Sequence, residues 1–280
     1  MKIAGWDYQD GLYVKTAYDW DSIMQYYVNY KGNKGFLKSY VAPKKAHERY
    51  HYIMEYFKKV DYKPSMLDVG CGEDHTMKEF KKYGFAVSGI EYSEDHIKNA
   101  VVWGSVCKPE KLQSHLKFNL IIMGHSVEHQ RDPIAYIKQY LKHLTPNGIM
   151  YIETPYVPSP DKISNEKLIK RLNLIYEHLF EFTPKALINT VESAGGEIVD
   201  VGRFDINHNT KYAKEIGYML ITAKPFTLNP FKLFKPCFIL LWILIKAFFV
   251  GTVQKEIPLS SEYHGYSDFI RIIIKGKKEV

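Results

Sequence analysis

The chain has 280 residues, of which 46% are hydrophobic, so it can bury a sizeable core as one large domain or two small ones. Its formal net charge of +7 suits an anionic partner, such as a phosphorylated substrate, or a solvated basic surface. The three cysteines are far apart and form no CxxC pair, which argues against a disulfide framework or a zinc site and fits a reducing compartment.

The N-terminal part of the chain is rich in aromatic side chains. Residues 1–62 hold 11 of the 22 tyrosines, and such a density argues against a disordered tail. No apolar segment of a signal peptide stands at the N-terminus, so we expect a cytoplasmic protein. A helix is expected over residues 44–59, and Pro64 marks a break. We therefore assign residues 1–64 to an aromatic-rich, helical N-terminal cap.

Strand-like and helix-like segments alternate from residue 66 onward. The expected strands cover residues 66–70, 85–92, 118–124, 148–154, 197–204 and 217–223, and helices are expected at 75–84, 93–100, 132–144 and 182–196. Asp132 should cap its helix, with Pro133 at the first helical position. This alternation predicts a doubly wound α/β fold with helices on both faces of a parallel sheet, over residues 65–225.

The last part of the chain, residues 226–280, differs in composition. Residues 231–253 form its most apolar stretch, and a strand-like segment follows at 268–276. As a helix, the segment from 236 to 253 would span roughly 27 Å, which is borderline for crossing a bilayer. Three interpretations stay open: contact with a membrane surface, packing in the core or in a homodimer, and a true span.

Two glycines follow the first expected strand, in the stretch MLDVGCGEDH (66–75). Ligands of open α/β sheets bind beyond the carboxyl ends of the strands, and glycine lets the backbone approach them closely. A dinucleotide site would show GxGxxG, but here Glu73 and Asp74 follow Gly72 and would repel a pyrophosphate. The pattern therefore favours a nucleoside ligand that carries positive charge.

The stretch Asp68-Val-Gly-Cys-Gly72 resembles motif I of class I S-adenosylmethionine-dependent methyltransferases, and three further stretches match that family in its order. Glu91 ends the second strand, where the family places the acid that binds the ribose hydroxyls. HSVEHQRDP (125–133) is similar to the EH…DP stretch that follows the fourth strand, and EHLFEFTP (177–184) to a stretch of the small-molecule and sugar branch. The resemblance implies S-adenosylmethionine as cofactor and a mostly parallel sheet with an antiparallel strand near its end.

The resemblance also implies a set of cofactor-binding residues at the strand ends. These residues are Asp68, Gly70, Cys71, Gly72, Glu91, Tyr92, Ser105, Gly124 and His125. The chain departs from the family at two places. Asp74 stands where a third glycine is frequent, and Ser105 lies where the family has an acid that contacts the adenine. We expect the hydroxyl of Ser105 to take over that contact.

Three histidines in these motifs, His178, His129 and His125, are candidates for the catalytic base, because a hydroxyl acceptor is a poor nucleophile without one. Each could instead be a structural histidine. We predict no metal centre, although on one helical turn His125, Glu128 and His129 would share a face and could bind a divalent ion. That set is similar to the E-x-x-E-H stretch of quinone-type methyltransferases, but Pro133 places the start of the helix later.

The function that these observations favour is methyl transfer from S-adenosylmethionine to a hydroxyl of a sugar or nucleotide-linked sugar in surface polysaccharide biosynthesis. The carbohydrate part rests on the resemblance alone. Lys162, Lys170 and Arg171 would meet an acceptor phosphate or be solvated. Two alternatives stay open: methylation of a quinone or lipid at the inner membrane surface through contact of 231–253, and an inactive cofactor-binding partner subunit. Nucleic acid is not expected as a partner, since no Asn-Pro-Pro-Tyr-type motif is present and the basic charge is spread.

Overall fold

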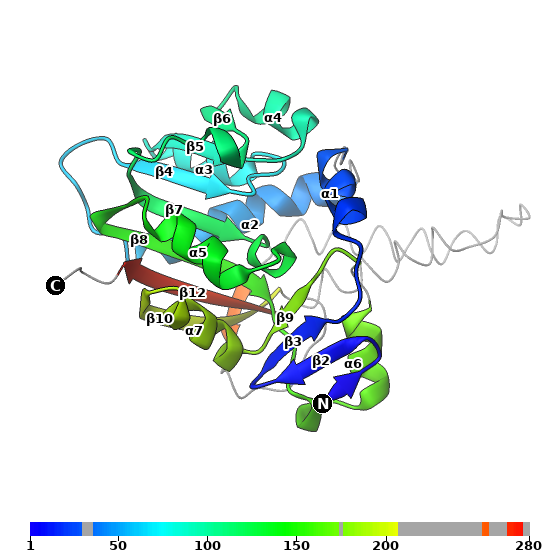
Figure 1. Ribbon diagram of the computed structural model, residues 1–280. Helices are drawn as coiled ribbons and strands as arrows, with labels where there is room; N and C mark the ends of the chain where they lie inside the picture. The colour runs from blue at the N-terminus through cyan, green and yellow to red at the C-terminus, as the bar shows by residue number, and fades with distance from the viewer. Residues whose placement is uncertain (30–35, 174–175, 207–253, 258–267, 277–280) are drawn as a thin grey trace, which may run out of the picture.

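The computed structural model describes residues 1–29, 36–173, 176–206, 254–257 and 268–276. An eight-stranded sheet forms the centre of this part of the chain (Figure 1). Its strands, in order across the sheet, are β11 (Gln254–Ile257), β10 (Gly196–Ile206), β12 (Asp268–Gly276), β8 (Leu144–Pro155), β7 (Phe118–Gly124), β4 (Ser65–Val69), β5 (Ala86–Ile90) and β6 (Ser105–Cys107).

The predicted α/β fold is confirmed by the strand directions. The five strands from β8 to β6 are parallel to one another, whereas β12 runs antiparallel between β8 and β10. Because of the parallel order, the carboxyl ends of β4, β5 and β7 lie along one edge of the sheet, and this edge is where a ligand is expected.

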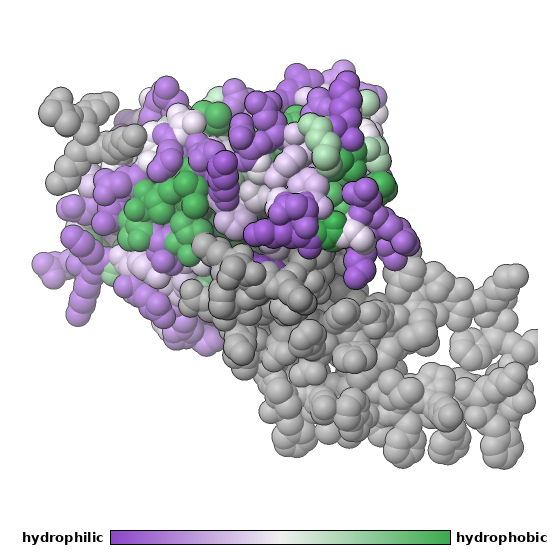
Figure 2. Space-filling view, turned by 90° about the horizontal axis from the view of Figure 1, so that it is seen from below, coloured by the Kyte–Doolittle hydropathy of each residue, from purple (hydrophilic) through white to green (hydrophobic). Residues whose placement is uncertain are grey.

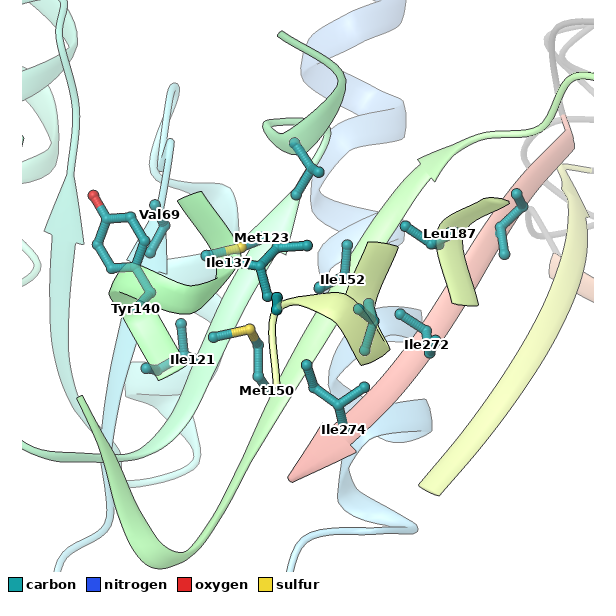
Figure 3. Packing of buried hydrophobic residues seen from close by; sticks show 14 of the residues in the cluster. Val69, Ile121, Met123, Ile137, Tyr140, Met150, Ile152, Leu187, Ile272 and Ile274 are labelled. Atoms are coloured by element: carbon teal, nitrogen blue, oxygen red, sulfur yellow. The ribbon is translucent and has the colours of Figure 1, made fainter. Parts of the chain in front are cut away.

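Helices cover both faces of the sheet. Two of them, α5 (Pro133–Leu141) and α7 (Pro184–Ser193), pack their apolar sides on one face, and Figure 3 shows Ile137, Tyr140 and Leu187 against Met123, Ile152 and Ile272 of the strands. The opposite face packs against α2 (Phe36–Met54), α3 (His75–Lys82) and α4 (Glu94–Ala100) through a second buried apolar cluster. Both layers fix the edge of the sheet that carries the motifs.

A small sheet lies beside the central one, and it adds strands to the N-terminal segment for which we expected a helical cap. Its strands are β1 (Lys2–Ile3), β2 (Trp6–Gln9), β3 (Leu12–Lys15) and β9 (Phe180–Phe182). The turn between β2 and β3 is Asp10-Gly11, with positive φ at both residues, which is a favoured hairpin connection. Trp6 and Tyr13 are fully buried there, so part of the aromatic excess forms a core of its own.

Other expected elements are shifted or lie outside the described residues. The helix expected over 44–59 is α2, which begins earlier and ends at Met54, and α1 (Trp20–Val28) precedes it. Two short helices, η3 (Pro160–Lys162) and α6 (Asn165–Leu172), follow β8, and η1 (Pro109–Lys111) follows β6. The strand expected at 217–223 and the apolar stretch 231–253 lie outside the described residues.

Polar and charged residues cover most of the described surface that Figure 2 shows, with apolar residues gathered in limited patches. Among the helices of the described residues, none is long and apolar enough to cross a membrane.

Candidate functional site

The two glycines of the turn after β4 have different roles at the end of this buried strand. Gly70 has φ +79°, and an added Cβ would lie 3.2 Å from the Cβ of Ser126, so the turn packs directly on the loop after β7. Gly72 has φ +51°, and among the described residues an added Cβ would come within 4 Å of the Gly70 carbonyl oxygen alone, at 4.0 Å. Gly70 therefore brings two strand ends together, while Gly72 leaves open space for a ligand.

Glu91 lies beside this turn, directly after β5. One of its carboxylate oxygens accepts a hydrogen bond from the Gly72 amide at 2.8 Å, and the other accepts from the amides of Tyr92 and Ser93 at 2.7 and 3.0 Å. These bonds fix the carboxylate at the edge of the open space. A carboxylate has about four acceptor positions and three are used here, so one position, on the oxygen that accepts from Gly72, remains for a ribose hydroxyl.

Asp68 is a buried carboxylate at the end of β4 and is only 4% exposed. Burial raises its pKa to about 7, although the charge of Arg49 works in the opposite direction. None of the hydrogen bonds within the described residues involves its side chain. Such a group is stabilised by a nearby cation, and the methionine part of S-adenosylmethionine carries both a sulfonium and an ammonium group. The turn, Glu91 and Asp68 together fit this cofactor.

Arg49 lies over the end of β7, a position that no sequence motif indicated. It comes from α2, and an added Cβ on Gly124 would meet its guanidinium at 3.0–3.2 Å. It donates to Thr76 and to Glu153, both at 2.8 Å. Glu153 is buried near the end of β8 and also binds Arg271 at 2.8 Å and the Tyr151 hydroxyl. One signal for this network was available in the sequence: Glu153 is the one charged residue of β8.

His125 lies between two carboxylates and has φ +56°, an uncommon backbone conformation for a residue other than glycine. Its Nδ1 atom lies 3.4 Å from Glu128 and its Nε2 atom 3.2 Å from Glu153. Burial disfavours the charged ring, but the two carboxylates outweigh this effect and raise the pKa of His125. Both ring nitrogens therefore face carboxylates, and this environment makes His125 a poor candidate for a base.

Glu128 is fully buried in η2 (Val127–His129), among three imidazoles. Burial favours its neutral form, but His125, His129 and His178 outweigh it and lower the pKa of Glu128 to about 2. The Nε2 atom of His129 lies 4.0 Å from one of its oxygens. The Nδ1 atom of His129 lies 2.6 Å from the Tyr27 hydroxyl and 3.1 Å from the Glu177 carbonyl oxygen. Burial lowers the pKa of His129.

His178 completes this cluster from the segment that precedes β9. Its ring centroid lies 4.7 Å from that of His129, at an angle of 77°. Ligand atoms of Glu128, His129 and His178 all lie within 4.8 Å of one another, so these three residues could hold a metal ion. The set differs from the one expected on a helical turn: residues 127–129 form a short 3-10 turn, and His178 stands in the place expected for His125.

The structure brings most of the predicted cofactor residues to one edge of the sheet. Cys71 lies in the turn, but its side chain is buried in the core, close to Gly89, and its backbone amide binds the Ile90 carbonyl. Gly124 is covered by Arg49. Ser105 is not brought to the others: it begins β6 and pairs with Ser88, whereas the end of β6 beside Glu91 is Cys107.

The fold and the site define a nucleoside-binding α/β domain of the methyltransferase type, and comparison with known proteins agrees. The family model described as "Methyltransferase domain" matches residues 41–201, so the chain belongs to this family. It is a class I S-adenosylmethionine-dependent methyltransferase domain, and S-adenosylmethionine is its cofactor.

Three similar proteins illustrate the relationship. A "Ubiquinone biosynthesis O-methyltransferase" of Pelagibacter ubique is 34% identical over 98 residues, which cover 32% of this chain and 41% of the relative. A SAM-dependent methyltransferase structure from Archaeoglobus fulgidus is 18% identical with a TM-score of 0.51, covering 83% of this chain and 94% of that one. The structure of Burkholderia thailandensis 1,6-didemethyltoxoflavin-N1-methyltransferase is 12% identical with a TM-score of 0.55, covering 98% of this chain and 99% of that one. The two structures support the fold.

Proposed function

We propose that this protein is an O-methyltransferase that acts on a phenolic hydroxyl of a quinone precursor, with His178 as the base. The observation that carries the proposal is the buried cluster of Glu128, His129 and His178 on and beside the loop after β7. Ser126 of the same loop packs on Gly70 of the cofactor turn. Cofactor residues and titratable side chains therefore meet at one edge of the sheet, as transfer to a hydroxyl requires.

The chain's own residues hold the acceptor and move its proton. When bound, S-adenosylmethionine supplies an activated methyl group. The acceptor oxygen would take the methyl carbon as the carbon–sulfur bond of the cofactor breaks, giving S-adenosylhomocysteine, and Nε2 of His178 would take the proton of the acceptor hydroxyl. Glu128 stabilises the imidazolium that forms, because it is fully buried and its low pKa keeps it ionised. Arg49 is the cation near the strand ends that suits the carboxylate of the methionine part.

Two arguments favour a phenol over the sugar expected from the sequence. A phenolic hydroxyl has a pKa near 10, so a histidine base can deprotonate it during transfer, whereas sugar hydroxyls are much less acidic. The Pelagibacter relative is named for ubiquinone biosynthesis, although this chain spans less than half of its length. Arg171, a candidate for a sugar phosphate, is buried in an ion pair with Glu181 and is not available to an acceptor.

A methyl-transfer assay tests this function. The full-length protein is incubated with tritiated S-adenosylmethionine and three acceptors: a catechol that carries a short isoprenoid chain, a nucleotide sugar, and a primary amine. We expect label in the catechol only, and about 100-fold less in the His178→Gln variant. Label in the sugar would restore the carbohydrate interpretation. Binding of S-adenosylhomocysteine without transfer to any acceptor would support an inactive partner subunit.

A lipid-linked acceptor would bring the enzyme to a membrane surface, and we propose that residues 231–253 make this contact. The support is the sequence of the segment, whose apolar run is flanked and interrupted by lysines. Flotation of the full-length protein with anionic vesicles tests it. We expect co-flotation that Leu241→Asp abolishes, whereas flotation unaffected by this change, or no flotation, would refute the contact.

A further inference from the structure

We propose that Glu181 and Arg171 are positioning residues that hold His178 in a single tautomer, with its Nε2 atom free to receive a proton. The catalytic part of this inference rests on the proposed function, since that function assigns the base to His178. The structural part concerns the ring alone and can be tested without an acceptor.

The anchor of the arrangement is an ion pair between α6 and β9. Arg171 donates from two guanidinium nitrogens to the two oxygens of Glu181, at 2.8 and 3.1 Å. The two residues are only 3% and 1% exposed. Two hydrogen bonds from one planar guanidinium group fix both carboxylate oxygens in its plane. Removal of either partner would leave a buried charge. Glu181 therefore has no freedom to rotate toward solvent.

The fixed carboxylate in turn holds the ring of His178. The Nδ1 atom of His178 lies 2.7 Å from the Glu181 oxygen that also accepts from Arg171. An ionised carboxylate only accepts hydrogen bonds, so the proton of this contact belongs to Nδ1. In the neutral ring, Nε2 then carries the lone pair. Among the described residues this nitrogen has no hydrogen-bond partner, and the ring lies in the buried cluster with Glu128 and His129.

The two neighbouring imidazoles are held differently. Both nitrogens of His125 face carboxylates, and Nδ1 of His129 faces the Tyr27 hydroxyl and a backbone carbonyl. The charged or titratable groups around His178 are Glu177 and Glu181 on its own segment, Glu128 and His129 from η2, and Arg171 behind Glu181. Of the three rings, His178 has a carboxylate on Nδ1 and, within the described part of the chain, no hydrogen bond on Nε2, which is the arrangement that orients a base.

The substitution Glu181→Gln tests the inference with little change in shape. A glutamine side chain has one oxygen and one NH2 group, so it cannot accept from both guanidinium nitrogens and also hold the Nδ1 proton. We expect kcat with the isoprenyl catechol to fall about 10- to 100-fold, a part of the roughly 100- to 10,000-fold that a positioned general base contributes, with KM for S-adenosylmethionine unchanged. Nitrogen-15 NMR of the ring, assigned by comparison with His178→Gln, should show one tautomer in the wild type and a mixture in Glu181→Gln.

Glu79→Gln is the matched control. Glu79 is also buried and binds a histidine and a cation, His47 at 2.8 Å and Lys82 at 2.6 Å, but it lies on α3 outside the cluster. We expect this variant to leave both kcat and the His178 signals as in the wild type. A wild-type ring already in mixed tautomers, or unchanged by Glu181→Gln, would overturn the inference. If instead the wild type holds one tautomer but methylates no acceptor, the proposed function fails and the positioning of the ring stands.

Discussion

Asp68 is expected to lower the stability of the cofactor-free protein at neutral pH while it favours cofactor binding, and the pH dependence of unfolding tests this. Its carboxyl group has a folded-state pKa of about 7, against 3.8 for an unperturbed aspartate, because it is buried. Between these two values the folded state binds more protons than the unfolded state. The stability contribution of this group therefore falls as the pH rises from about 4 to about 7, and the loss is complete above the folded pKa.

The magnitude follows from this shift. One pKa unit corresponds to about 1.4 kcal/mol, so the charged carboxylate destabilises the cofactor-free protein by about 3 kcal/mol more at pH 8 than at pH 5. Asp68→Asn removes this titration at nearly constant shape. We expect the difference between the Tm of Asp68→Asn and the Tm of the wild type to be about 5–10 °C larger, in favour of the variant, at pH 8 than at pH 5. Affinity for S-adenosylhomocysteine should fall at the same time, since the carboxylate that would pair with the ammonium group of this ligand is lost.

Thermal unfolding followed by circular dichroism at the two pH values, without cofactor, measures the effect. Asp95→Asn serves as the control, because Asp95 lies half-exposed on α4 and pairs with Lys98 at the surface. A Tm difference between wild type and Asp68→Asn that is equal at pH 5 and pH 8 would contradict the argument. So would unchanged affinity of Asp68→Asn for S-adenosylhomocysteine in a calorimetric titration.

Three further predictions concern the turn and the histidine cluster. Gly70→Ala should destabilise the protein by about 1–3 kcal/mol in thermal unfolding and weaken S-adenosylhomocysteine binding, because φ is +79° and Ser126 lies 3.2 Å from the added Cβ; an unaltered Tm would contradict this. The low pKa of Glu128 contributes about 3 kcal/mol above pH 4.5 that is lost as the pH falls toward 2, so the wild type should lose its stability advantage over Glu128→Gln in acid urea titrations, and a pH-independent difference would refute it. Activity should survive EDTA, because the His125 imidazolium already neutralises Glu128 at 3.4 Å; loss of activity that Mg²⁺ or Mn²⁺ restores would instead make Glu128, His129 and His178 a metal centre.

Much of this protein was determined locally and could be predicted from the sequence. The alternation of apolar runs and capped helices specified the α/β sheet, since Asp132 and Pro133 open α5 as expected and the glycine turn ends β4 where the pattern placed it. These features depend on residues within a few positions of one another. The Asp10-Gly11 hairpin was equally local, and only the expectation of a helical cap concealed it.

The contacts that decide the chemistry depend instead on residues far apart in the chain. Arg49 reaches Glu153 across 104 positions, and Arg271 reaches the same carboxylate across 118, because β12 inserts beside β8. No periodicity or spacing encodes such pairings. The three motif histidines looked alike in the sequence, and burial among particular carboxylates separated them: His125 lies between two acids, whereas His178 is held through one nitrogen by Glu181. Sequence supplied the residue types, and tertiary packing assigned their charge and orientation, because both depend on which groups surround a side chain once water is excluded.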